Sequence, residues 1–132
     1  MLLPCTFVCN TEHVIIWLLI GILHLCRYEL VVFTSAQPDY GQMIVNAIDP
    51  CNCISHILCR PSTTVMDGIY VKDISRLGRN LSRSIIVDNS PESYLLQPEN
   101  AIPIAPFFGD ASDRALDDTL GLLTAIVRVP TL

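Results

Sequence analysis

Residues 28–36 read YELVVFTSA, and residues 84–91 read SIIVDNSP. Each block is a short apolar run rich in β-formers that ends in polar groups, which is typical of a strand buried on both faces. Between the two blocks, Pro38 begins a stretch with helical spacing of apolar residues that stops at Asp49-Pro50. Strands that alternate with helices predict an α/β fold, with a parallel sheet flanked by helices.

Further elements are predicted around these blocks. Asp67-Gly68 is a turn signal that can close a hairpin within an otherwise irregular stretch. Residues 101–105 (AIPIA) predict a short or edge strand, because Pro103 cannot donate a ladder hydrogen bond. A closing helix is predicted after the N-cap Ser112, with an apolar stripe at helical spacing formed by Leu116, Leu120, Leu123 and Val127.

The chain has 132 residues, the size of one small domain. Hydrophobic residues make up 51% of it and charged residues 16%, a composition that excludes an intrinsically disordered chain. The formal net charge is −5. A nucleic-acid partner bound over a broad basic face is therefore excluded as well.

The composition changes near Arg27, so we divide the chain into a divergent apolar segment, residues 1–26, and a domain, residues 27–132. The uninterrupted apolar run Val14–Leu23 is about half as long as the ~20 residues that a spanning helix needs. A secretory signal begins with basic residues, but no Lys or Arg precedes Arg27. A membrane anchor at Val14–Leu23, a buried segment, and a splice or gene-model artefact all stay open.

The six cysteines and three histidines all lie in the first half of the chain. Because no secretory signal precedes them, we expect mostly free thiols in a reducing compartment. One cluster, Cys51, Cys53, His56 and Cys59, offers four soft ligands for Zn²⁺, although its spacing differs from that of paired zinc knuckles. Burial as small apolar side chains is the alternative.

Polar residues follow both predicted strands. In a parallel sheet the carboxyl ends of the strands share one edge, where ligands bind. Thr34 and Asp88-Asn89 fall at this edge, and a hydroxyl and a carboxylate suit phosphate and metal contact. In the alternative, Thr34 caps the next helix, and Asp88-Asn89 make a turn before Pro91.

Lys72 is the only lysine of the chain, and three arginines follow it at helix-like intervals: Arg76, Arg79 and Arg83. This spacing predicts either a basic rim that meets an anionic group or a solvated face of a helix.

Four blocks in order, YELVVFTSA, GIYVKDISRLGR, SIIVDNSPESY and PENAIPI, resemble the NLI-interacting-factor-like phosphatase domain. This haloacid-dehalogenase-superfamily group includes the small C-terminal-domain phosphatases and Dullard, and the likeness covers about residues 28–123. It implies a haloacid-dehalogenase-like fold and a Mg²⁺-dependent phosphatase that acts on phosphoserine or phosphothreonine in proteins. It implies that Thr34 binds the phosphoryl group and that Lys72 neutralises its charge. It also implies that Asp88, supported by Asn89, holds Mg²⁺.

The chain departs from this family in one respect. The family's D-x-D-x-T motif, which carries the nucleophile and the general acid/base, should precede YELVVF by several dozen residues. Residues 1–27 contain one acidic residue, Glu12, and no aspartate. We therefore expect an inactive chain, with phosphatase rates no better than those of a Lys72→Ala control.

The missing segment also has a structural side. Without it, the fold is expected to be N-terminally incomplete, because the strands at 28–33 and 84–87 lose a shared neighbour unless Val14–Leu23 replaces it. A similar motif, ALDDTL, falls after the DNSP block on the closing helix. We interpret its Asp117 and Asp118 as a solvated face.

A second resemblance points to a different class of function. Residues 93–116, SYLLQPENAIPIAPFFGDASDRAL, are similar to the phosphatase-like receptor subunit of the mitochondrial inner-membrane presequence translocase. This likeness implies a protein-import partner in place of a phosphoprotein substrate, whereas DNSP favours the phosphatase branch. The expected location is the nucleus or an endomembrane in the first case, and the mitochondrial inner membrane in the second.

Overall fold

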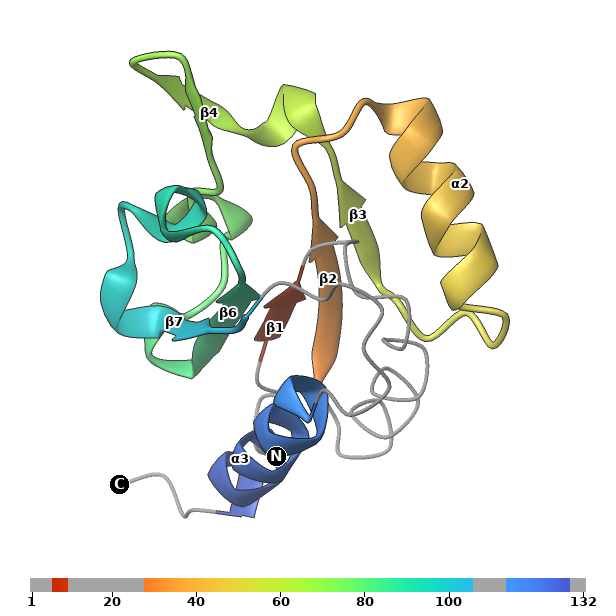
Figure 1. The fold of residues 1–132 in the computed structure, drawn as a ribbon, viewed down its shortest axis with the longest axis vertical. Helices are drawn as coiled ribbons and strands as arrows, with labels where there is room; N and C mark the ends of the chain where they lie inside the picture. Colours follow the sequence, from red (N-terminus) through yellow and green to blue (C-terminus); the bar gives the residue numbers. More distant parts are fainter. Residues whose placement is uncertain (1–5, 10–27, 106–113, 129–132) are drawn as a thin grey trace.

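The computed structural model describes residues 6–9, 28–105 and 114–128 (Figure 1). Its centre is a five-stranded sheet in the order β3-β2-β1-β6-β7, in which every neighbouring pair is parallel. The strands are β1 (Thr6–Cys9), β2 (Glu29–Phe33), β3 (His56–Leu58), β6 (Ser84–Asp88) and β7 (Ala101–Pro103). A separate antiparallel hairpin is formed by β4 (Thr64–Met66) and β5 (Ile69–Val71). The predicted α/β fold with a parallel sheet is confirmed.

The central strand is β1, which pairs with β2 on one side and with β6 on the other. Phe7, for example, lies opposite both Leu30 and Ile85. The prediction that residues 28–33 and 84–87 lack a shared neighbour is therefore wrong. A strand that is hydrogen-bonded along both edges can be very short. The four residues of β1 are too few to form a recognisable pattern in the sequence. The run Val14–Leu23, proposed as a replacement strand or an anchor, lies outside the described residues.

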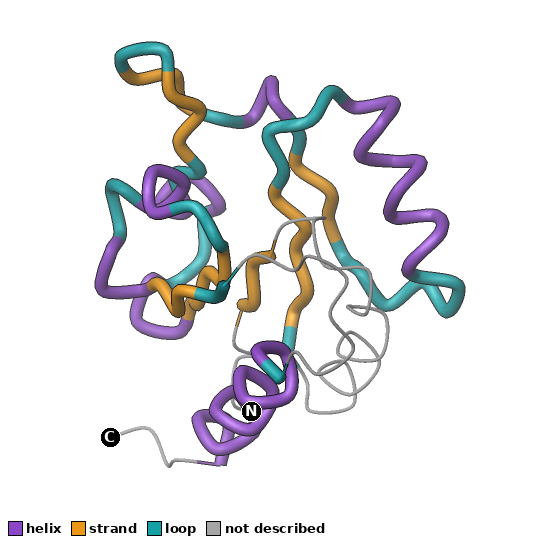
Figure 2. The backbone as a smooth tube through the Cα atoms, in the orientation of Figure 1, coloured by secondary structure: helices purple, strands orange, loops and turns teal. Residues whose placement is uncertain are grey.

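The sheet separates two apolar layers. Figure 2 shows the strands in orange and the helices in purple. On one face, Leu30 and Val32 belong to a core that also takes in residues of α2 (Pro38–Ile48) and α3 (Ala115–Arg128). On the other face, Val31 and Phe33 pack with Ile74 of the short 3₁₀ helix η2 (Ile74–Leu77). The period-2 alternation along β2 thus serves both layers, as expected for a strand buried on both faces.

Both predicted helices form. Pro38 opens α2, and Asp49 ends it, with both carboxylate oxygens accepting backbone N–H bonds at 2.8 Å from Cys53 and Ile54. These bonds turn the chain toward β3, a strand that the sequence did not reveal. In α3, the Leu123 side chain is fully buried, and its carbonyl accepts a 2.7 Å bond from the Tyr28 hydroxyl. The predicted N-cap Ser112 lies outside the described residues.

The stretch from Lys72 to Arg83 does not form the single helix that the alternative of a solvated helix face requires. It contains η2 and the short 3₁₀ helix η3 (Leu81–Arg83), separated by a turn at Gly78 with φ 69°. Arg79 does not contribute to a basic face. Its guanidinium forms a bidentate ion pair with Glu29, with Nε–Oε1 at 2.6 Å and Nη2–Oε2 at 2.9 Å. The hydrogen bond from Arg79 lowers the pKa of Glu29. Helical spacing failed here because glycine and local turn bonds divided the segment.

The predicted hairpin turn is confirmed. Asp67 and Gly68 both have positive φ, 51° and 77°, as a two-residue turn that matches the twist of its strands requires.

Within the described residues, no helix combines the length and the apolar character needed to cross a membrane.

Gly41 of α2 allows the helix to approach the end of the sheet closely. A Cβ at this position would lie 2.9 Å from Cys59 Sγ and 3.3 Å from Thr34 Cγ2. Gly41→Ala is therefore expected to destabilise the fold by about 1–3 kcal/mol through overpacking. The matched control is Gly121→Ala in α3, where a Cβ meets nothing within 4 Å and helix propensity predicts a gain of about 0.5–1 kcal/mol. Urea unfolding of the two variants measures both; equal effects would contradict the close contact.

Candidate functional site

Of the predicted site residues, Lys72 and Asp88 line one cavity at the carboxyl edge of the sheet, whereas Thr34 and Asn89 lie at this edge but are not among the residues that line the cavity. Thr34 directly follows β2, and Asp88 is the last residue of β6, with β1 between these two strands. Two strand spacings put the two backbones about 10 Å apart. Both side chains are buried, Thr34 at 6% and Asp88 at 1% exposure.

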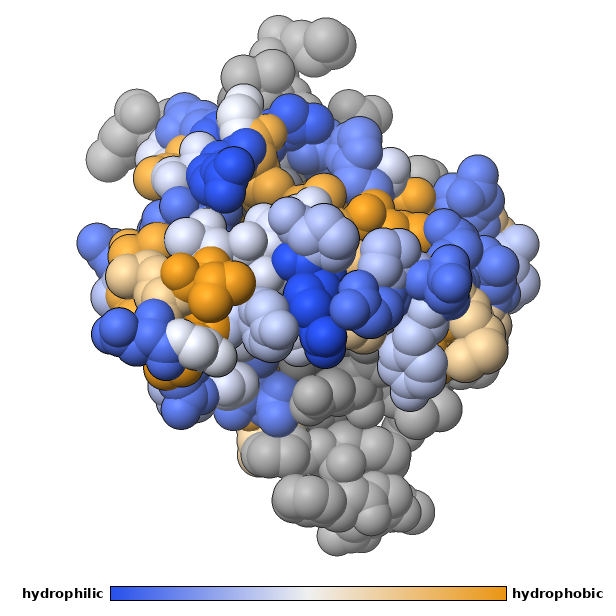
Figure 3. Space-filling view, turned by 90° about the horizontal axis from the view of Figure 1, so that it is seen from above, coloured by the Kyte–Doolittle hydropathy of each residue, from blue (hydrophilic) through white to orange (hydrophobic). Residues whose placement is uncertain are grey.

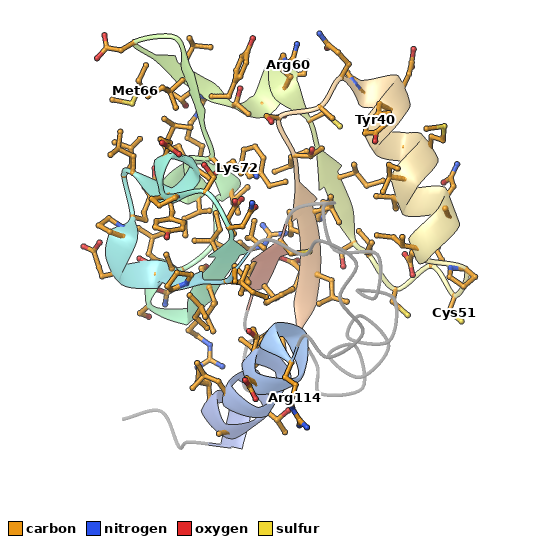
Figure 4. The ribbon with its side chains drawn as sticks, in the orientation of Figure 1. Tyr40, Cys51, Arg60, Met66, Lys72 and Arg114 are labelled. Atoms are coloured by element: carbon orange, nitrogen blue, oxygen red, sulfur yellow. The ribbon has the colours of Figure 1, made fainter. Side chains whose placement is uncertain are left out.

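Lys72 completes the centre of this edge. Its Nζ lies 2.5 Å from Asp88 Oδ2, and the lysine is 4% exposed. Figure 4 shows Lys72 at the base of the hairpin, beside the segment that follows β6. The interpretation of Lys72 as part of a solvated helix face is wrong. An ion pair is the arrangement that makes two buried charges tolerable at all.

Local turns hold the two strand ends. The second oxygen of Asp88, Oδ1, accepts a hydrogen bond from the N–H of Ser90 at 2.9 Å. This bond forms the turn before Pro91 that the sequence analysis gave as the alternative to a binding role. Thr34 Oγ1 accepts the N–H of Ala36 at 3.1 Å, but the N-cap of α2 is Gln37, so Thr34 is no helix cap. The Asp88 turn and the Lys72 ion pair form together on one carboxylate.

A cavity of about 300 Å³ opens on this pair. It is lined by residues from three segments, namely Ser35, Ile69, Tyr70, Lys72, Asp88, Ser90, Glu92 and Ser93. Glu92 at its rim accepts a 2.5 Å bond from the Ser90 hydroxyl, which lowers the pKa of that carboxyl. Seen from this end, the surface mixes hydrophilic groups with hydrophobic patches (Figure 3). The cavity thus has a charged floor and a wall that is partly apolar.

Arg60 stands beside the cavity and was missed by the sequence analysis. Its guanidinium carbon lies 4.8 Å from the centre of the Tyr70 ring, and its Nε donates to the Ser35 carbonyl at 2.8 Å. Both partners line the cavity. The stacked guanidinium adds positive charge to this rim.

Cys9 ends the central strand near the ion pair. It is buried, and burial raises the pKa of its thiol to about 12, with Lys72 opposing and Asp88 adding to the effect. The side chain therefore stays a protonated thiol at neutral pH and supplies no thiolate nucleophile.

The proposed zinc cluster does not assemble. Cys51 and Cys53 lie on the turn after α2, while Cys59 is buried against α2 beside Gly41. In the part of the chain that the structure describes, no three His, Cys, Asp or Glu side chains gather as metal ligands. All four described cysteines are free thiols, as predicted.

A hard cation in the cavity would meet one buried carboxylate. Asp88 is that group, and the adjacent Asn89 is half-buried. Mg²⁺ is commonly held by one or two carboxylates that are completed by substrate phosphate and water. Asp88 and Asn89 could supply oxygen donors to such an ion, although Lys72 bonds one oxygen of the Asp88 carboxylate and the Ser90 N–H bonds the other.

Comparisons with known proteins show which family the chain belongs to. The family model for NLI interacting factor-like phosphatase matches residues 22–132. A probable C-terminal domain small phosphatase of Dictyostelium discoideum is 48% identical over 103 residues, covering 78% of this chain and 34% of that protein. A human carboxy-terminal domain RNA polymerase II polypeptide A small phosphatase 1 is 40% identical, with 77% and 39% covered. The mitochondrial import inner membrane translocase subunit TIM50 of Phytophthora infestans is 44% identical, with 80% and 27% covered.

The chain therefore spans about a third of the length of these relatives. The fold is similar to that of the fission yeast RNA polymerase II CTD phosphatase Fcp1 bound to beryllium fluoride, with a TM-score of 0.60 and 14% identity. That match covers 94% of this chain and 50% of the Fcp1 chain. The parallel sheet and the family match agree: the chain belongs to the NLI interacting factor-like phosphatase family.

Proposed function

We propose that this chain is a phosphoryl-binding, catalytically silent member of its family. Thr34 and Lys72 contact the phosphate of a phosphoserine or phosphothreonine protein, and Asp88 with Asn89 holds Mg²⁺. The observation that carries the proposal is the Lys72–Asp88 pair, buried at the floor of an open cavity at the carboxyl edge of the sheet. A buried ammonium that faces a cavity suits an anionic group, because positioned charge there is poorly screened.

The proposed lack of turnover rests on the nucleophile. Phosphoryl transfer in this family begins with attack by an aspartate carboxylate. Residues 1–27 contain no aspartate, and the described strand β1 ends in the protonated thiol of Cys9. Asp88 accepts bonds from Lys72 and from the Ser90 N–H, which draw charge from its carboxylate and make it a weak nucleophile. Asp118 of the look-alike motif is exposed on α3, as predicted, and the Asp117 side chain lies outside the described part.

Magnesium has a binding role in this proposal. When bound, the ion supplies positive charge to a phosphate group. Asp88 offers it a carboxylate oxygen, and Lys72 balances the remaining negative charge. Mg²⁺ is therefore expected to tighten phosphate binding.

The experiment is a calorimetric titration of the chain with a phosphoserine peptide, with and without Mg²⁺. Thr34→Val removes a hydroxyl of the site and should weaken binding about fivefold, the value of roughly one hydrogen bond. The matched control is Thr63→Val, another buried threonine, whose hydroxyl donates 2.6 Å to the Arg60 carbonyl. A parallel assay with p-nitrophenyl phosphate should show no turnover above the Lys72→Ala variant. Mg²⁺-dependent release of nitrophenol well above that level would contradict the proposed lack of catalytic activity.

A second candidate is a receptor for basic presequences, and it is supported by the TIM50 relative. The hairpin exposes apolar side chains, among them Val65 at 62% exposure, and the chain carries a net charge of −5. An acidic chain with exposed apolar groups suits a basic amphipathic helix. The same titration with such a peptide separates the two: salt-sensitive binding of this peptide, with no binding of the phosphopeptide, favours the receptor.

A further inference from the structure

Lys72 lies in a stretch without regular secondary structure, between β5 and η2. Its long side chain has many rotamers, so its contact with Asp88 at the tip does not by itself fix its position. The backbone around it must therefore be held by something else.

Hydrogen bonds from one neighbouring segment hold this backbone on both sides of the lysine. The N–H of Lys72 donates to the Ser93 carbonyl at 2.8 Å. The N–H of Ile74 donates to Gln97 Oε1 at 3.1 Å, and Gln97 Nε2 donates to Asp73 Oδ1 at 2.8 Å. The single amide of Gln97 thus acts as acceptor and as donor for two successive residues.

Gln97 is itself connected by hydrogen bonds to β6, the strand that ends in Asp88. Its N–H donates to the Tyr94 carbonyl, and its carbonyl accepts the N–H of Asn100, both at 3.1 Å. The Asn100 amide bonds the carbonyl of Ser84 at 3.0 Å, at the start of β6. Gln97 therefore connects the segment with Lys72 to the strand that ends in Asp88.

Burial makes this connection hard to replace. Gln97 is 9% exposed, and Ile74 is 1% exposed. Water has little access to either group, so loss of the amide leaves a buried N–H without its partner. Burial raises the pKa of the Asp73 carboxyl, and bonds from Ser75 and Gln97 bring it below its usual value, so Asp73 stays an acceptor.

We propose that Gln97 is a positioning residue, which holds Lys72 in line with Asp88 by clamping Asp73 and Ile74. The glutamine contacts no ligand itself. It keeps the ammonium in the cavity floor, so its loss changes where Lys72 lies as well as how stable the chain is.

The test uses the fact that Lys72 is the only lysine in the chain. Reaction of the native chain with an amine-acylating reagent, followed by peptide mapping, measures the exposure of this one ammonium against that of the N-terminal amine. Gln97→Met keeps the shape and removes both hydrogen bonds, and it should raise the acylation rate of Lys72 at least about tenfold by local opening.

Two controls separate positioning from general instability. Gln42→Met makes the same chemical change on the exposed face of α2, where Gln42 bonds Asn46 at 2.8 Å, and should leave Lys72 protected. Val45→Ala destabilises the core beneath α2 while the clamp stays intact. If Val45→Ala exposes Lys72 as much as Gln97→Met does, the positioning role is refuted.

A charge exchange gives a rescue. Gln97→Glu keeps an acceptor for the Ile74 N–H but sets a carboxylate against Asp73, so Lys72 should become reactive. Adding Asp73→Asn restores a donor–acceptor pair and should return most of the protection. No recovery in the double variant would overturn the clamp.

Phosphopeptide affinity gives a second readout, which rests on the proposed function. Gln97→Met should weaken it about fivefold or more, while Gln42→Met leaves it unchanged. The lysine readout needs no ligand, so the two ideas fail separately. If the native chain binds no phosphopeptide but Lys72 responds as described, the proposed function falls and the clamp stands.

Discussion

Replacement of Lys72 by methionine is expected to lower the free energy of unfolding by about 3–5 kcal/mol, because it leaves the Asp88 carboxylate buried without its counter-ion. Asp88 is 1% exposed, so water cannot take over the role of the ammonium. The Ser90 N–H still bonds the other oxygen but carries no net charge. Urea unfolding followed by circular dichroism measures the loss.

The matched double variant decides the cause. Lys72→Met combined with Asp88→Leu removes both charges and keeps similar volumes, and it should recover most of the stability that the single change loses. Arg79→Met breaks the Arg79–Glu29 ion pair, whose side chains are 41% and 20% exposed, and should cost no more than about 1 kcal/mol. A Lys72→Met variant as stable as Arg79→Met would contradict the buried pair.

The second large effect concerns the central strand. Phe7→Ala should cost about 3–5 kcal/mol, because Phe7 is 1% exposed and its removal leaves a cavity in the core. The ring also meets Tyr28 edge-on, with centroids 6.2 Å apart. Thermal and urea unfolding measure the change.

An exposed site on the hairpin provides the control for Phe7. Val65→Ala changes an apolar residue that is 62% exposed, so stability should shift by less than about 0.5 kcal/mol. If Phe7→Ala were as mild as Val65→Ala, Thr6–Cys9 would not be the central strand.

The elements that the sequence predicted are those with strong local signals. The residues of β2 and β6 are compact β-forming runs, α2 has Pro38 at its start, and the hairpin has Asp67-Gly68. The elements that it missed, β1 and β3, are very short and exist because neighbouring strands pair with them. Pairing across the sheet is a tertiary effect that no local pattern reports.

The candidate site divides in the same way. Thr34 and Asp88 follow recognisable strands, so their shared edge was predictable from topology alone. Lys72 was singled out by its residue type and by a family resemblance, yet its helical spacing suggested a solvated face. Its burial depends on contacts with Asp88, the last residue of β6, and with Ser93 in the segment that follows this strand. Gln97 lay in a quoted motif, but no spacing rule links its amide to Ile74.

The placement of β1 has a consequence for synthesis on the ribosome. Thr6 pairs with Ser84, so the middle of the sheet is bounded on one side by a strand made early and on the other by one made much later. While the intervening chain emerges, β1 has one edge of unpaired N–H and C=O groups and an apolar surface open to other chains. Such long-range pairing favours slow folding, and we expect a nascent chain that ends before Ser84 to require chaperone protection.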